Sequence, residues 1–124
     1  MRILIVDDDA TLRSMTTALL QREGFETIAV RHGRAAVEAV DRADAGDYAA
    51  IVVQVNVTPS PIDAREPTGM ALLQHMQKTK PYLVARTVVI TTMPRLEVAA
   101  CAAIVQPFDI GALLEAVRRC LHRS

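Results

Sequence analysis

Three consecutive aspartates, Asp7, Asp8 and Asp9, are the residues best placed to do chemistry, because they directly follow the apolar run 3–6. Carboxylates held so close together repel one another, and a divalent cation that prefers hard oxygen ligands relieves that repulsion. An acid-rich helix start is the other explanation, and Asp9 alone would satisfy it. Asp7 and Asp8 precede the expected helix, so they predict an acidic pocket whose suitable metal is Mg²⁺.

The elements that must position this pocket are indicated by alternating patterns along the chain. Short apolar runs, typical of buried parallel strands, alternate with segments of helical period. The expected strands are 2–6, 25–30, 49–53, 87–91 and 102–105. Three expected helices start at the caps Asp9, Thr68 and Asp109. Two more are expected over 34–43 and, as a short helix, over 94–100. Gly24 and Pro81 are expected just beyond the ends of the first and third helices.

This order predicts one α/β domain over residues 1–124, a doubly wound five-stranded parallel sheet in the flavodoxin-like order 2-1-3-4-5. Pro59, Pro61 and Pro67 predict a long loop after the third strand, and the fourth helix is expected to be short. Ligands of such sheets bind at the carboxyl ends of the strands. The acidic pocket is therefore expected at that edge.

Composition limits the partners and the location. The chain has 124 residues with 14 basic and 14 acidic side chains, and only four aromatic residues. This balance disfavours nucleic acid and membrane surfaces as partners, and the first apolar run is too short for an export signal or a membrane span. Cys101 and Cys120 match no zinc or disulfide framework. We expect both to be reduced thiols in a cytoplasmic protein.

Over its whole length the chain resembles the receiver domain of bacterial response regulators. Four segments carry the resemblance in family order: 3–9, 11–13, 24–25 and 106–108. The resemblance implies that Asp7 and Asp8 help to hold Mg²⁺, and that an aspartate at the end of the third strand accepts phosphate from a histidine kinase. It also implies a hydroxyl after the fourth strand, and a lysine before the Pro-Phe pair, that bind the phosphate.

The chain departs from this family at the positions that do the chemistry. Gln54 stands at the acceptor position, and an amide is not nucleophilic at phosphorus. Gln106, followed by Pro107, stands at the lysine position, and Ala103 stands where the family usually places a switching aromatic residue. The hydroxyl is retained by Thr91 or Thr92, which the sequence does not distinguish.

These departures predict a pseudo-receiver without catalytic residues, one that is not an enzyme. We expect the Gln54 and Gln106 amides to hydrogen-bond to each other or to the acidic pair. No cofactor is required, and Mg²⁺ binds weakly at most through Asp7 and Asp8. The module is expected to act without phosphorylation, by binding a protein such as a histidine kinase, as a monomer or a homodimer. With no output domain in the chain, its effect is expected to pass through docking.

Two alternatives stay open. Residues 7–11 also fit the Asp-x-Asp-x-Thr signature of haloacid-dehalogenase-type phosphatases, which would use Asp7 and Asp9. No later acid completes that metal site, and the segment 106–108 would go unexplained. A receiver phosphorylated at a non-standard acid, such as Asp63, Glu66 or Asp8, is the second alternative.

Overall fold

The structure of the chain is a computed structural model that describes residues 1–31, 33–55, 69–92 and 99–121. Strands and helices alternate along most of this length. The strands are β1 (Arg2–Val6), β2 (Glu26–Val30), β3 (Ala50–Gln54), β4 (Thr87–Thr91) and β5 (Ala102–Val105). The helices in the described ranges are α1 (Ala10–Arg22), α2 (Gly33–Arg42), α3 (Gly69–Thr79), α4 (Pro81–Val84) and α5 (Ile110–Cys120).

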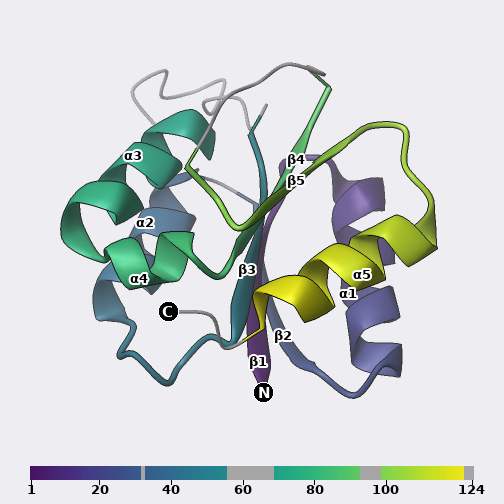
Figure 1. The fold of residues 1–124 in the computed structure, drawn as a ribbon, viewed down its shortest axis with the longest axis horizontal. Helices are drawn as coiled ribbons and strands as arrows, with labels where there is room; N and C mark the ends of the chain where they lie inside the picture. The colour runs from purple at the N-terminus through teal and green to yellow at the C-terminus, as the bar shows by residue number, and fades with distance from the viewer. Residues whose placement is uncertain (32, 56–68, 93–98, 122–124) are drawn as a thin grey trace.

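The strands form one parallel sheet in the order β2-β1-β3-β4-β5, as the sequence predicts. Figure 1 shows α1 and α5 on one face of the sheet and α2, α3 and α4 on the other. This is the doubly wound arrangement, in which right-handed crossovers between parallel strands place helices on both faces. It brings the carboxyl ends of β1, β3, β4 and β5 to one edge.

The core consists of two apolar layers separated by the sheet. Because successive side chains of a strand point to opposite faces, Ile3 and Ile5 pack against α1 and α5, while Leu4 and Val6 pack against α2 and α3. β3 and β4 alternate in the same way. Burial on both faces explains why these strands read as continuous apolar runs, and it leaves their carboxyl ends as the place for polar side chains.

The predicted helix boundaries are largely confirmed. Asp9 caps α1 and Asp109 caps α5, each accepting hydrogen bonds from main-chain N–H groups of the first helical turn. Gly24 follows α1 with a φ of 93°, a conformation that glycine adopts without steric cost. α3 ends at Thr79 as expected, but Pro81 then opens the short helix α4. The sequence reading missed α4, although proline suits the first position of a helix because its missing N–H is not needed there.

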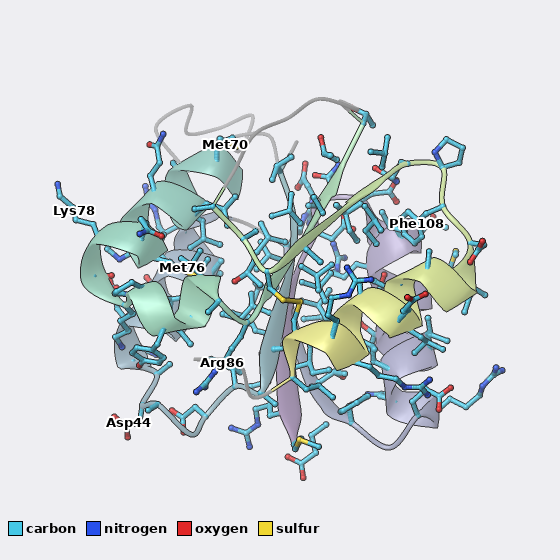
Figure 2. The ribbon with its side chains drawn as sticks, in the orientation of Figure 1. Asp44, Met70, Met76, Lys78, Arg86 and Phe108 are labelled. Carbon is cyan, nitrogen blue, oxygen red and sulfur yellow. A yellow bond between two sulfur atoms is a disulfide. The ribbon has the colours of Figure 1, made fainter. Side chains whose placement is uncertain are left out.

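The cysteines contradict the sequence prediction. Cys101 and Cys120 form a disulfide with their Cα atoms 5.8 Å apart, visible as the yellow bond in Figure 2. The prediction of two reduced thiols is therefore wrong. Spacing along the chain could not reveal the pair, because the packing of α5 on the sheet brings its last residue to the start of β5.

Other predictions concern residues outside the described ranges. The proposed cap Thr68 and most of the loop after β3 lie there, as do residues 94–98 of the expected fourth helix. The last two residues of that expected helix, Ala99 and Ala100, are described and are not helical. No helix in the described ranges is long and apolar enough to cross a membrane.

Candidate functional site

Residues predicted from sequence meet at the carboxyl edge of the sheet. Asp7 follows β1, Gln54 ends β3, Thr91 ends β4 and Gln106 follows β5, and these strands are neighbours in the sheet. The Gln106 main-chain N–H donates a 2.7 Å hydrogen bond to the Thr91 carbonyl oxygen. The parallel topology therefore assembles one polar site from positions that are far apart in the chain.

Asp7 is the buried acid of the site, with only 2% of its surface exposed. Its Oδ1 accepts a hydrogen bond from the Asp9 N–H at 2.9 Å, and the Arg13 Nη1 donates to the Asp7 carbonyl oxygen at 2.9 Å. Burial raises the pKa of the Asp7 carboxyl from 3.8 to about 6, an effect that the Asp9 N–H and Arg13 reduce and that the charges of Asp9 and Asp8 increase. This side chain changes its charge just below neutral pH.

The neighbouring acids lie in different surroundings. Asp8 is half-buried and Asp9 is exposed. The Asp9 Oδ1 accepts hydrogen bonds from the main-chain N–H groups of Thr11 at 2.9 Å and Leu12 at 3.1 Å. Asp9 therefore works as the cap of α1, which accounts for it without any catalytic role.

Gln54 places a buried amide oxygen at the tip of β3. Its Oε1 has no hydrogen-bond partner among the described residues, which is costly because a buried carbonyl oxygen loses its bonds to water. The start of α3 covers this strand end closely. A Cβ atom added to Gly69 would lie 2.6 Å from the Gln54 carbonyl oxygen and 2.6 Å from the Val55 Cα. Only glycine fits at this approach.

The two candidate hydroxyl residues differ in their surroundings. Thr91 is 1% exposed and belongs to β4, where it follows Ile90. Thr92 comes after the strand and is exposed. Thr91 is thus enclosed in the core, whereas Thr92 is open to solvent.

The remaining predicted positions lie on and after β5. Ala103 is exposed and pairs with Val89 of β4. Gln106 is half-buried, and its peptide bond to Pro107 is cis. The sequence predicts hydrogen bonds between the Gln54 and Gln106 amides, or between these amides and the acidic pair. Within the described residues the Gln54 Oε1 takes part in no such bond.

The metal-ligand set of the site is small. Within the described residues no group of three or more histidine, cysteine, aspartate or glutamate side chains is arranged to hold a metal ion. Asp7 and Asp8 are the carboxylates that directly follow β1. The alternative acceptors Asp63 and Glu66 lie outside the described ranges. Because position 54 is glutamine, the site has one carboxylate ligand fewer than it would have with aspartate there.

Comparison with known proteins points to one family. No protein-family model matches the chain. It is 31% identical over 123 residues to the transcriptional regulatory protein TcrA of Mycobacterium tuberculosis, covering 99% of the chain and 47% of TcrA. It is 31% identical over 125 residues to the DNA-binding response regulator MtrA of the same organism, covering 99% of the chain and 51% of MtrA. The chain thus spans about half the length of these relatives.

Solved structures agree with these relatives. The chemotaxis protein CheY4 of Vibrio cholerae superposes with a TM-score of 0.76 at 26% identity, over 97% of the chain and 98% of CheY4. Sheet order, the acidic pair after β1 and these similarities support one assignment. The chain has a CheY-like fold and is similar over nearly its whole length to about half of these response regulators, which supports a response regulator receiver domain of two-component signal transduction.

Proposed function

We propose that this receiver signals without phosphorylation at the strand tip and acts by binding another protein. The observation that carries the proposal is the amide of Gln54 at the end of β3, where the resemblance places the phosphate-accepting aspartate. A carboxamide cannot form an aspartyl phosphate. Its buried Oε1, without a partner in the described residues, fits a site that no longer pairs a carboxylate with a cation.

Two further positions support this proposal. Gln106 provides no cation for an incoming phosphoryl oxygen, and its main-chain N–H is engaged by the Thr91 carbonyl oxygen. Ala103 offers only a methyl group where the family usually has a switching aromatic residue. The acceptor, the cation and the aromatic readout are thus all replaced, which is consistent with a module that lacks the usual switch.

We assign the switch hydroxyl position to Thr92. Along β4, Val89 packs on the α2 and α3 side and Ile90 on the α1 and α5 side. Continued alternation places Thr91 with Val89, in agreement with its burial, and Thr92 on the same side as Gln54. Thr91 is then a structural residue of the core, and Thr92 the hydroxyl at the site.

Magnesium is not required in this proposal and binds weakly at most. Asp7 and Asp8 would hold it, and its chemistry would be to neutralise charge at the site. The uncharged oxygen of Gln54 is a poorer ligand than a carboxylate, and the raised pKa of Asp7 means that protons compete with the metal near pH 6. Calorimetry at pH 7.5 should therefore give little or no Mg²⁺ heat.

The partner in this proposal is a protein, such as a histidine kinase, and the chain is a monomer or a homodimer. Relatives such as MtrA bind DNA, but the chain matches only about half of them, and its formal net charge is zero. We therefore propose no contact of this chain with nucleic acid or membrane. We place it in the cytoplasm; the Cys101–Cys120 disulfide weighs against that location, because cytoplasmic thiols are normally kept reduced.

Incubation with acetyl phosphate and Mg²⁺, followed by intact-mass measurement, tests the proposal. The native chain should gain no phosphoryl group. The double variant Gln54→Asp/Gln106→Lys should gain one, which shows that the scaffold and conditions are competent, and Gln106→Lys alone should not. In the double variant, Thr92→Ala should lower the phosphorylated fraction.

Phosphorylation of the native chain would contradict the proposal. Peptide mapping would then tell whether Asp8, Asp63 or Glu66 carries the group. Hydrolysis of a generic phosphate ester that disappears in Asp7→Asn would instead favour a phosphatase. The capping role of Asp9 weighs against a phosphatase, because two hydrogen bonds to its Oδ1 already account for this side chain.

A further inference from the structure

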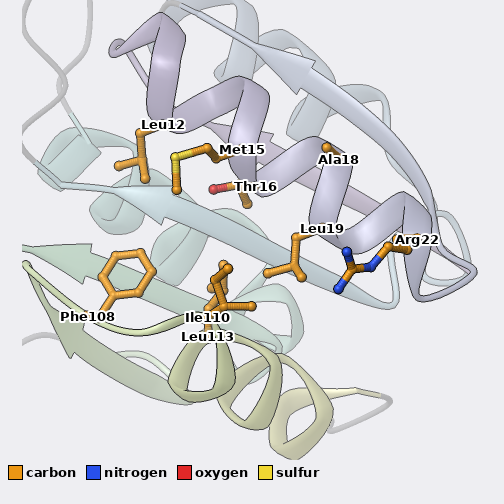
Figure 3. Close-up of a pocket in the computed structure, with 9 residues that line it drawn as sticks. All are labelled: Leu12, Met15, Thr16, Ala18, Leu19, Arg22, Phe108, Ile110 and Leu113. Atoms are coloured by element: carbon orange, nitrogen blue, oxygen red, sulfur yellow. The ribbon is translucent and has the colours of Figure 1, made fainter.

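An apolar groove separates α1 from the start of α5. It encloses about 270 Å³, and Figure 3 shows its side chains converging from the two helices. Its lining residues are Leu12, Met15, Thr16, Ala18, Leu19, Arg22, Phe108, Ile110 and Leu113. The spacing of Leu12, Met15 and Leu19 along the chain is typical of the core face of a helix and does not reveal that they leave a space.

The groove is apolar at its rim as well as inside. Met15 is 54% exposed and Ile110 is 53% exposed, and both belong to the small set of large hydrophobic side chains found exposed in the described ranges. Solvent contact with such side chains is unfavourable. A ligand with an apolar chain would remove both from water.

Arg22 gives the groove a polar end. In Figure 3 its guanidinium leans back toward Leu19, while Leu12 and Phe108 lie at the opposite end. The other arginines on these helices are engaged: Arg118 with Glu23, Arg119 with Glu115, and Arg13 with the Asp7 carbonyl oxygen. Arg22 has no ion-pair partner among the residues that the structure describes.

We propose that this groove binds a free medium-chain monocarboxylate, with the carboxylate on Arg22 and the chain running toward Phe108. An apolar cavity of about 150 Å³ holds benzene, so about 270 Å³ accommodates a chain of roughly ten carbons. A guanidinium binds a carboxylate through paired hydrogen bonds. Apolar walls with one cation at one end are complementary to this chemistry and not to a polar or a cationic ligand.

Titration of the intact protein with decanoate, below the concentration at which it forms micelles, tests the proposal through amide chemical shifts. We expect saturable shifts confined to α1 and the start of α5, and weaker binding of 1-decanol. Arg22→Gln should weaken decanoate binding about tenfold, because it removes a charge-assisted contact, and should leave 1-decanol binding unchanged. Arg42→Gln is the matched control, since Arg42 occupies the same last-turn position in α2 and lines no part of the groove.

A second variant tests the apolar part separately. Ile110→Trp places an indole at the rim and should abolish the binding of both ligands. The proposal is overturned if decanoate gives no saturable shifts, if the shifts map elsewhere, or if 1-decanol binds as tightly as decanoate. It is also overturned if the free protein forms dimers that Ile110→Trp disrupts, because a second copy would then cover the groove.

Discussion

Replacing Asp7 by asparagine should stabilise the fold above pH 6. The folded state raises the pKa of this carboxyl from 3.8 to about 6, chiefly through burial. The folded state therefore binds the proton more tightly than the unfolded state does, and stability falls as the pH rises from about 4 to about 6. The difference of about two pKa units corresponds to ~3 kcal/mol, which is lost in full above pH 6.

The substitution removes the buried charge and keeps the shape of the side chain. The Oδ1 of asparagine can still accept the Asp9 N–H, which now lies 2.9 Å from the Asp7 Oδ1. The new amide group can donate to polar atoms at the strand tips, where the Gln54 Oε1 is unpartnered within the described residues. We expect the free energy of unfolding at pH 7.5 to rise by about 2–3 kcal/mol.

Urea unfolding followed by circular dichroism, repeated from pH 4 to pH 8, measures this effect. The native chain should lose stability between pH 4 and pH 6 beyond the loss seen in Asp7→Asn. Glu38→Gln is the control, because it removes one negative charge from an exposed position on α2. The buried carboxylate is not the source of the stability lost between pH 4 and pH 6 if Asp7→Asn is less stable than the native chain at pH 7.5. The same conclusion follows if its stability depends on pH as that of the native chain does.

Substitutions at three other contacts are expected to lower the free energy of unfolding. Gly69→Ala should destabilise the fold by about 1–3 kcal/mol, because its Cβ would lie 2.6 Å from the backbone at the tip of β3. Lys80→Met should cost about 1–2 kcal/mol, because Nζ donates three hydrogen bonds, of 2.5 to 3.1 Å, to carbonyl oxygens at the end of α2. Replacing Cys101 and Cys120 by alanine should cost ~3 kcal/mol, because the disulfide closes a loop between residues 19 apart in sequence. Thermal and urea denaturation measure all three.

Matched variants test whether each loss of stability comes from the contact named for it. Gly46→Ala adds a Cβ that meets no atom within 4 Å, so a loss equal to that of Gly69→Ala would contradict the steric argument. Lys78→Met removes an exposed lysine from α3, and an equal loss there would show that the contacts of Lys80 contribute little. Reduction of the native chain by a dithiol should reproduce the loss in the cysteine variant; full stability after reduction would refute the cross-link argument.

Much of the fold could be predicted because its signals are local. The central strands β1, β3 and β4 are continuous apolar runs, since a parallel sheet covered on both faces buries nearly every position of its central strands. The caps Asp9 and Asp109 act on N–H groups within three residues of themselves. The bounds of β1, β4 and β5 agree with the expected ones, whereas β2 begins one residue later than expected and β3 both begins and ends one residue later.

The candidate site could be located but not described in advance. Parallel topology is sufficient to bring Asp7, Gln54 and Gln106 to one edge. Among the described residues the Gln54 Oε1 accepts no hydrogen bond, which the sequence did not predict because amide orientation depends on neighbours that spacing does not specify. The difference in burial between Thr91 and Thr92 likewise depends on where the sheet ends.

By itself, then, the sequence determined the order of elements, the helix caps and the identity of the polar residues at the strand ends, because each depends on neighbours along the chain. The tertiary structure alone decided three properties: the raised pKa of Asp7, the Cys101–Cys120 disulfide, and the groove between α1 and α5. Each arises between segments distant in sequence, where burial and distance are set by how the helices pack on the sheet.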